Sequence, residues 1–243
     1  MVSIVVLAHN NREVSRRCVA SVLAHTRPDY ELILVDNGST DGTAAYFQSL
    51  ARRDFRVHAV VRERNYGVCA RNFGFEQARG EFICTLDNDT EVGEGWLEAL
   101  LAPLADPGVG GTGVEGVCFD NAWAHAVQSW QLPPDRREGL RVDVLVGYCF
   151  LFRNLVAQIG GYDWAFGPFW NEEADFCLRL KAQGLRLEVH QAAVRHHAHA
   201  TSARYVENVE RLMADHDRLL RERWDDRKGE VFECNRGTRG CGR

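Results

Sequence analysis

The chain has 243 residues, of which 45% are hydrophobic and 26% charged, and its formal net charge is −5. An ordinary apolar fraction with 10% aromatic residues excludes a disordered chain, and 29 basic residues intermixed with 34 acidic ones argue against a duplex nucleic-acid partner. The longest nearly apolar run, residues 144–152, is far shorter than the roughly 20 residues that a membrane-spanning helix needs. This length suits one large domain or two small ones.

Cysteine usage and the N-terminus both bear on the cellular compartment. The eight cysteines are scattered without a C-x-x-C pair, and several, such as Cys84 and Cys149, lie in apolar stretches where a thiol packs as a small core residue. Only Cys234 and Cys241, in a tail rich in glycine and arginine, are candidates for a disulfide or a ligand site. The first residues enter a strand-like run without a basic segment or cleavage site, so no signal peptide is visible. We therefore predict a soluble, cytoplasmic protein.

The first 105 residues alternate strand and helix patterns. Strands are expected at 2–8, 31–35, 55–61 and 81–86, and helices at 13–25, 66–79 and 96–104. Strands that alternate with helices pair in parallel and form a doubly wound sheet, in which ligands bind at the carboxyl ends of the strands. Asp36 and the acidic residues 87–89 directly follow two of these strands. We expect them to face one crevice.

The pattern changes after residue 105. Residues 107–119 are rich in glycine and 120–141 are irregular, and strand or helix patterns then follow at 142–152, 171–184, 186–190 and 202–224. Residues 108–113 match the string G-x-G-x-x-G, but the dinucleotide-binding motif requires a strand before it and a helix after it. Here a predicted helix precedes the glycines and an extended segment follows them. We interpret these residues as a flexible connection.

Asp87, Asn88 and Asp89 form a short acidic motif at a strand end. A solvated turn would also account for it, since D-x-D occurs often by chance. Mg²⁺ and Mn²⁺, however, are typically bound by carboxylates, while substrate phosphates complete the coordination shell of the metal. With Asp36 predicted at a neighbouring strand end, a divalent-metal site is the favoured interpretation.

Several motifs, taken in order, resemble those of the family 2 glycosyltransferases. They comprise residues 2–10, 34–43, 64–72, 80–89, 147–153, 160–163, 171–179 and 196–202. The resemblance implies an α/β protein of the GT-A fold, a single Rossmann-like nucleotide-binding domain with a mostly parallel central sheet fused to an acceptor-binding half. Residues 1–105 would form the nucleotide-sugar-binding half, 106–202 the acceptor and catalytic half, and 203–243 a C-terminal helix and a Gly/Arg-rich tail.

The resemblance also implies roles for individual residues on the donor side. Ala8, His9 and Asn10 would lie beside the nucleobase, Asp36 would hydrogen-bond to it, Arg71 would lie near the base or diphosphate, and Asp87 and Asn88 would approach the ribose or sugar. A carboxylate can accept a hydrogen bond from uracil or thymine N–H, and the guanidinium fork suits oxyanions. As alternatives, Arg71 is an ordinary charge on a helix surface and Asp36 only a turn residue.

The predicted metal ligands are Asp89 and a histidine. Asp89 would hold Mn²⁺ or Mg²⁺ on the diphosphate. The family often has a single metal-binding histidine a few residues before a serine or threonine, and among His196, His197 and His199 we favour His197, five residues before Ser202. A zinc site is the alternative, but no Cys or Glu stands at ligand spacing.

The predicted catalytic base is Glu173. Its segment matches an acidic motif of the family that is usually Glu-Asp and is here Glu172-Glu173, so the base is one methylene longer than the usual aspartate. Trp170 and Glu172 are expected on the acceptor side. The same residues also favour a helix start, since Asn171 can cap it and first-turn carboxylates interact well with the helix dipole. Both interpretations can hold together.

The implied function is metal-assisted transfer of a sugar, with inversion, from a nucleotide-diphosphate donor to an acceptor hydroxyl. A UDP- or dTDP-sugar is the preferred donor. The acceptor is a carbohydrate, a lipid-linked molecule reached by peripheral contact with a membrane, or a peptide. One alternative, a sugar-1-phosphate nucleotidyltransferase, would need a Gly-rich basic loop where this chain has residues 9–12, His-Asn-Asn-Arg. The other, a non-catalytic nucleotide-sugar-binding protein, would be expected to lack Asp89 or Glu173.

Overall fold

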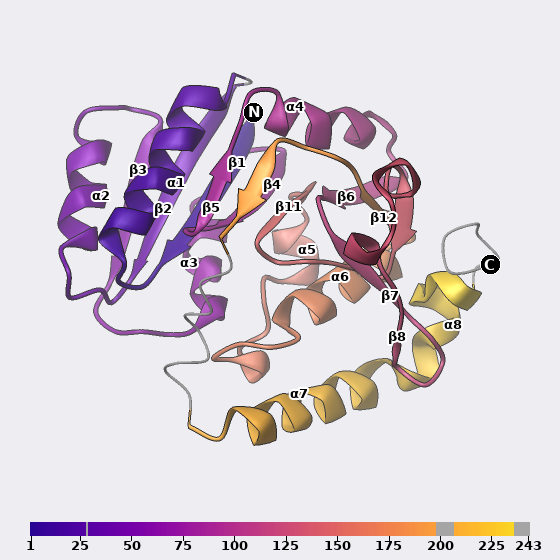
Figure 1. The fold of residues 1–243 in the computed structure, drawn as a ribbon. Helices are drawn as coiled ribbons and strands as arrows, with labels where there is room; N and C mark the ends of the chain where they lie inside the picture. Colours follow the sequence, from indigo (N-terminus) through magenta and orange to yellow (C-terminus); the bar gives the residue numbers. More distant parts are fainter. Residues whose placement is uncertain (28, 198–206, 236–243) are drawn as a thin grey trace.

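The computed structural model describes residues 1–27, 29–197 and 207–235 (Figure 1). Its centre is an eight-stranded sheet with the order β3-β2-β1-β4-β11-β6-β12-β9. The strands are β1 (Val2–Ala8), β2 (Tyr30–Asn37), β3 (Val57–Arg62), β4 (Phe82–Asp87), β6 (Val109–Gly113), β9 (Leu140–Val142), β11 (Cys149–Arg153) and β12 (Arg186–Val189). The first four are mutually parallel, and β11 runs antiparallel to both of its neighbours. The predicted mixed α/β fold with a mostly parallel sheet is confirmed.

Helices cover both faces of this sheet, and two small sheets flank it (Figure 1). The helices are α1 (Arg12–His25), α2 (Thr43–Ala51), α3 (Asn72–Phe75), α4 (Trp96–Leu101), α5 (Val156–Ile159), α6 (Glu172–Ala182), α7 (Val209–Trp224) and α8 (Lys228–Val231). The small sheets join β7 (Gly116–Phe119) to β8 (His125–Gln128) and β10 (Val144–Leu145), and β5 (Thr90–Val92) to β13 (Val194–His196). Within the described ranges, no helix has the length and apolar character to span a membrane.

Two hydrophobic cores result from the alternation of side chains along the central strands. On β1, Ile4 and Val6 face a core formed with α1, α2 and α4, whereas Val5 faces a second core formed with α3, α6 and α7. Successive side chains of a strand point to opposite faces, so a continuous apolar run is needed where helices cover both faces. The β1 sequence satisfies this requirement over nearly its whole length.

The helix predicted at 66–79 is much shorter in the structure. A 3₁₀ helix (Val68–Arg71) leads into α3, which ends at Phe75. Beyond it the backbone makes tertiary contacts: Arg79 N donates to the buried carboxylate of Glu31, and Gly80 N donates to Ser3 Oγ. The side chains of Ser3 on β1 and Glu31 on β2 thus accept hydrogen bonds from backbone N–H groups at the point where the predicted helix would have ended.

The prediction that the Gly-rich segment is a flexible connection is wrong. Its residues form β6, a buried strand between β11 and β12. Added Cβ atoms would lie only 3.1 Å from Leu151 O at Gly111 and 2.7 Å from Leu185 Cβ at Gly110. Glycine is disfavoured in strands in general, but here close packing from neighbouring elements requires it.

Candidate active site

The carboxyl ends of β1, β2 and β4 lie side by side at one edge of the sheet. Ala8 pairs with Asp36 across β1 and β2, and Leu7 pairs with Asp87 across β1 and β4. Neighbouring strands lie about 4.8 Å apart, so the residues that follow these ends share one rim. The structure thereby brings together the two acidic positions that the sequence predicted to face one crevice.

The loops after β1 and β2 are joined by hydrogen bonds. Asn10 N donates to Ser39 Oγ (2.7 Å), Asn10 Oδ1 accepts from Thr40 N (2.9 Å), and His9 Nδ1 lies 2.8 Å from Asn37 O. Asn10 has a left-handed φ of 58°, a conformation that asparagine adopts more readily than most residues. His9 and Asn10 are therefore held at the rim in a defined conformation.

Asp36 is buried at this rim, with 1% of its surface exposed. Its Oδ2 accepts a hydrogen bond from Ser39 N (3.2 Å), as a turn residue would, but its buried Oδ1 has no hydrogen-bond partner among the described residues. Leaving a buried carboxylate oxygen unpaired is unfavourable by about 1–3 kcal/mol. The turn interpretation thus accounts for only one of the two oxygens, and the other is available to a ligand N–H.

Sequence reasoning missed Asn37, the last residue of β2. This buried side chain donates to Asn65 Oδ1 (2.8 Å) and Gly67 O (3.0 Å) and accepts from Tyr66 N (2.9 Å). It fixes the segment that leads to Arg71. Its position directly after Asp36 at a strand end was the available signal.

Arg71 is buried, with 5% of its surface exposed, and is not a helix-surface charge. Its Nη2 donates to Asp87 Oδ1, while its Nε has no hydrogen-bond partner in the part of the chain that the structure describes. Burial raises the pKa of the Asp87 carboxyl, and the positive charge of Arg71 partly offsets this. An arginine held in this way retains unused donors beside the acidic motif.

Asp87, Asp89 and His196 form a cluster of potential metal ligands. One ligand atom from each lies within 4.8 Å of the others, with His196 Nε2 at 3.2 Å from Asp89 Oδ1 and 4.0 Å from Asp87 Oδ2. Burial lowers the pKa of His196, but the two carboxylates outweigh it, so the net shift is upward. Two carboxylates with one imidazole are a donor set that suits Mn²⁺. The residues therefore fit a divalent cation.

The histidine of this cluster is His196 and not the predicted His197. His197 Nε2 instead lies 3.0 Å from Glu91 Oε1. His196 is the last residue of β13 and lies opposite Thr90 of β5, whereas His197 follows the strand and its backbone N donates to Asp89 O (2.9 Å). The third candidate, His199, lies outside the described residues, as does Ser202.

The two tail cysteines are placed only in part. Cys241 lies outside the described residues, whereas Cys234 is exposed and follows the buried Glu233. The predicted disulfide or ligand site in the tail therefore stays a prediction.

Asn88 turns away from the other two residues of the acidic motif. Its Nδ2 donates to Ser15 Oγ on α1 at 2.8 Å. This hydrogen bond joins the end of β4 to α1. The predicted contact of Asn88 with the ribose or sugar stays a prediction.

The start of α6 carries the predicted base, but Asn171 does not cap it as predicted. Asn171 has a left-handed φ of 69°, and its Nδ2 donates to Asp217 Oδ1 of α7 at 2.8 Å. Trp170 Nε1 donates to the same oxygen at 2.8 Å. Both residues therefore attach the start of α6 to α7, and the Trp170 ring remains partly exposed.

Glu173 and Asp87 contact neighbouring residues of one segment, Gly147 and Tyr148. A Cβ atom added to Gly147 would lie 3.8 Å from Glu173 Cγ and Cδ, and the carbonyl of the next residue, Tyr148, accepts a hydrogen bond from Asp87 N (2.9 Å). Glu172 is buried, and burial together with the adjacent Glu173 carboxylate raises its pKa well above the usual range. The Oε2 atoms of both glutamates are buried, and neither has a hydrogen-bond partner within residues 1–27, 29–197 and 207–235.

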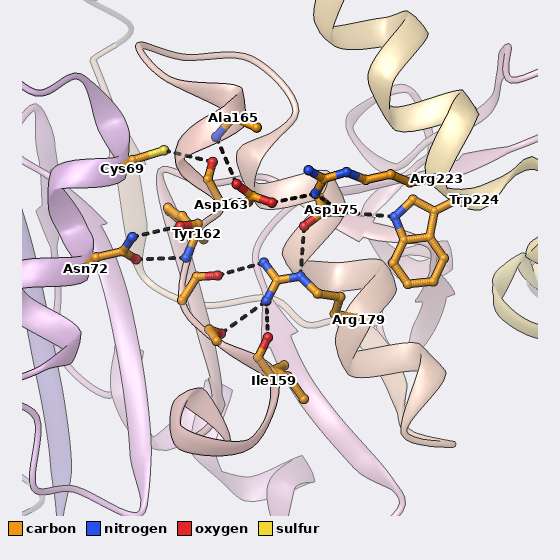
Figure 2. Close-up of polar contacts among 12 residues, drawn as sticks. Cys69, Asn72, Ile159, Tyr162, Asp163, Ala165, Asp175, Arg179, Arg223 and Trp224 are labelled. Carbon is orange, nitrogen blue, oxygen red and sulfur yellow. Dashed lines mark hydrogen bonds and ion pairs between the residues drawn. The ribbon is translucent and has the colours of Figure 1, made fainter.

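A hydrogen-bond network holds α6 in position (Figure 2). The buried Asp175 accepts from Arg179 Nε (2.8 Å) and Trp224 Nε1 (3.0 Å). Arg179 also donates to the carbonyl oxygens of residues 159–161. The helix that bears Glu173 is thus tied both to α7 and to the loop after α5.

The same loop is tied to the segment that bears Arg71. Asn72 Nδ2 donates to Tyr162 O (2.7 Å), and Asn72 Oδ1 accepts from Tyr162 N (2.8 Å), so both backbone groups of Tyr162 are held (Figure 2). Cys69 Sγ also contacts Asp163 O at 3.4 Å. The loop therefore connects the segment that bears Arg71 to the helix that bears Glu173.

Comparison with known proteins supports the resemblance. Residues 3–159 match the family described as glycosyl transferase family 2. The putative teichuronic acid biosynthesis glycosyltransferase TuaG of Bacillus subtilis is 37% identical over 102 residues, which are 42% of this chain and 40% of that protein. An undecaprenyl-phosphate 4-deoxy-4-formamido-L-arabinose transferase of Pseudomonas paraeruginosa is 35% identical over 153 residues, 60% of this chain and 43% of that protein. The chain thus spans about two fifths of the length of each of these relatives.

Two solved glycosyltransferases share the fold. The structure of GalNAc-T7 with UDP, GalNAc and Mn²⁺ matches with a TM-score of 0.74 and 19% identity, covering 93% of this chain and 49% of that one. The mannosyltransferase PcManGT of Pyrobaculum calidifontis, in complex with GDP-Man and Mn²⁺, matches with a TM-score of 0.60 and 19% identity, covering 79% and 56%. The GT-A fold expected from the sequence is confirmed. Because the family match at residues 3–159 covers more than half of the chain, the chain belongs to glycosyl transferase family 2.

Proposed function

We propose that this protein transfers a sugar from a nucleotide-diphosphate donor to an acceptor hydroxyl, with inversion at the anomeric carbon. The observation that carries the proposal is the cluster of Asp87, Asp89 and His196 beside the strand ends, with Glu173 next to Gly147 in the segment that contacts Asp87. Residues 1–105 would bind the donor, and residues 106–202 would supply the base and bind the acceptor. The Mn²⁺ present in both solved relatives supports Mn²⁺ or Mg²⁺ as the cofactor.

The metal ligands would be Asp89 and His196, with Asp87 beside them. A divalent cation held there supplies neutralising charge for the diphosphate as it leaves. Arg71, whose Nε has no hydrogen-bond partner, would add a fixed positive charge on the same side of the crevice. Asp87 would hold Arg71 in that orientation through their hydrogen bond.

The nucleobase would bind at Asp36, beside Ala8, His9 and Asn10. The buried Oδ1 of Asp36 needs a hydrogen-bond donor, and the N–H of uracil or thymine can supply one. This supports a UDP- or dTDP-sugar as the donor. The UDP bound by GalNAc-T7 is consistent with that choice, whereas the GDP-Man bound by PcManGT is a guanine nucleotide on the same fold.

Glu173 would take the proton of the acceptor hydroxyl. A sugar hydroxyl is a poor nucleophile at neutral pH, and a positioned base contributes about 10²–10⁴-fold. A single carboxylate would activate the acceptor on the face of the sugar opposite the leaving diphosphate. This arrangement supports one displacement at the anomeric carbon and therefore inversion. Trp170 and Glu172 would line the acceptor side, where the acceptor is a carbohydrate, a lipid-linked molecule or a peptide. The buried cysteines of the described chain are thiols, which supports a cytoplasmic location.

A thermal-shift panel tests the donor proposal. We expect UDP or dTDP to raise the Tm more than GDP or CDP does, and more with Mn²⁺ than with EDTA. Asp36→Asn should weaken nucleotide binding by about ten- to a hundredfold even without Mn²⁺, because its bond is to the base. The matched control is Asp54→Asn, an aspartate paired with Arg56 near the start of β3. If no nucleotide stabilises the protein, the proposed function is wrong.

A further inference from the structure

The ring of Tyr148 stacks on the imidazole of His196. The two ring centroids are 4.3 Å apart and the planes differ by 5°. The backbone of the same residue contacts another member of the cluster, because Tyr148 O accepts a hydrogen bond from Asp87 N (2.9 Å). One residue therefore contacts two of the three potential metal ligands, His196 through its side chain and Asp87 through its backbone.

Tyr148 also interacts with a second side chain. The carboxylate of Glu115, which lies between β6 and β7, interacts with the Tyr148 hydroxyl. The backbone of the same segment is tied to Glu115, whose carbonyl accepts from Val146 N at 3.0 Å. The Gly-rich strand β6, which the proposed reaction does not otherwise use, leads directly to Glu115 and so to the segment that bears Tyr148.

The backbone of His196 alone does not determine the orientation of its ring. The three-residue strand β13 positions the backbone by pairing with β5, but an imidazole can still rotate about its side-chain bonds. A flat aromatic surface at 4.3 Å restricts that rotation and leaves Nε2 directed at Asp89.

We propose that Tyr148 is a positioning residue for the metal site. Its ring holds the His196 ring in the plane that directs Nε2 toward the cation that Asp87 and Asp89 would also bind. This inference rests on the proposed function. A ligand that is already oriented loses less side-chain freedom when the metal binds. The electron-rich face of a phenol ring also favours an imidazole from which a cation withdraws electron density.

Mn²⁺ binding tests the proposal without an activity assay. Free Mn²⁺ is measured by electron paramagnetic resonance during titration of the full chain, with and without UDP. Tyr148→Leu removes the ring and should weaken Mn²⁺ binding by about tenfold or more, as is typical when a residue that orients a metal ligand is lost. Tyr148→Phe keeps the ring and should stay within about threefold of wild type. Tyr46→Leu, which removes a half-buried tyrosine from α2, is the matched control and should bind normally.

Two outcomes would overturn the proposal while leaving the proposed function intact. One is equal Mn²⁺ affinity in wild type and Tyr148→Leu. The other is a loss in Tyr148→Phe as large as in Tyr148→Leu, because the hydroxyl and not the stacked ring would then matter. A wild-type protein that binds no Mn²⁺ even with UDP would instead contradict the proposed function, and the inference with it.

A measurement on the wild-type protein avoids any folding defect of the leucine variant. Stacking on a phenol ring displaces the ring proton resonances of the imidazole upfield. We expect this displacement for the His196 resonances, assigned with His196→Asn, and expect it to persist in Tyr148→Phe. Resonances of His196 at the positions of an exposed histidine would overturn the proposal.

Discussion

The ammonium group of Lys181 lies 2.7 Å from Oε1 of Glu233, and both side chains are almost completely buried. Lys181 belongs to α6 and Glu233 to the segment after α8. Asp143 completes the cluster, at 2.9 Å from the same nitrogen. A buried ion pair between α6, which bears Glu173, and the C-terminal segment makes that segment part of the packing around α6.

Lys181→Met should destabilise the fold by about 3–5 kcal/mol, because it leaves two buried carboxylates without their cation. Urea unfolding measures this change. The chain has only one other lysine, Lys228, which pairs with Asp225 near the surface, and Lys228→Met should cost no more than about 1 kcal/mol. Similar unfolding midpoints for the two variants would contradict the structural role of the buried cluster.

Glu172→Gln should flatten the dependence of stability on pH. The folded-state pKa of Glu172 is raised, so its contribution is fully present below the unfolded-state pKa of about 4.5 and is lost as the pH rises through the folded-state value. A glutamine stays neutral, and we expect the variant to gain stability relative to wild type between about pH 5 and pH 8. Urea midpoints at the two pH values check this, with the exposed Glu222→Gln as control. Parallel profiles for wild type and Glu172→Gln would refute the prediction.

Glu173→Gln should lower kcat by about 10²–10⁴-fold, because glutamine keeps the size of the side chain but cannot accept a proton. Donor affinity should stay near that of wild type. The measurement is release of the nucleoside diphosphate from a sugar donor that carries the nucleotide selected by the thermal-shift panel. Water takes the place of the acceptor hydroxyl. Glu173→Asp should retain partial activity. Normal turnover in Glu173→Gln with loss of activity in Glu172→Gln would reassign the base to Glu172.

His196→Asn should weaken Mn²⁺ binding by about ten- to a hundredfold, whereas His197→Asn should bind nearly as wild type does. The two substitutions are matched in kind and lie next to each other, so a general effect on β13 would weaken both. Calorimetric titration with MnCl₂ distinguishes them. The reverse order of affinities would restore His197, the histidine favoured from the sequence.

Local sequence patterns were sufficient for the first strands of the chain. The continuous apolar run at Val2–Ala8 became β1 with the same bounds, and the acidic residues after two predicted strands lie at one rim of the sheet. A strand buried on both faces needs an uninterrupted apolar run, and parallel strands end at one edge. Both facts can be read without knowledge of distant contacts.

Tertiary contacts decided the elements for which local propensity was misleading. Gly108–Gly113 has the composition of a loop, yet most of it forms β6, where neighbouring groups leave little room for a Cβ atom. Arg71 lies in a pattern typical of an exposed helix, yet it is buried against Asp87. The groups that pack against β6 and against Arg71 are distant in the sequence, so a local pattern cannot predict these contacts.

The sequence by itself therefore determined the family, the fold class and the acidic motif at the strand end, because ordered local motifs carry that information. Only the tertiary structure decided which histidine joins the acidic motif. His196 ends β13 and lies by Asp89, whereas His197 follows the strand and lies by Glu91, so the choice between them depends on how β13 pairs with β5. That pairing is a contact between segments far apart in the chain, with His196 opposite Thr90, and the same fold brings His196 against the ring of Tyr148.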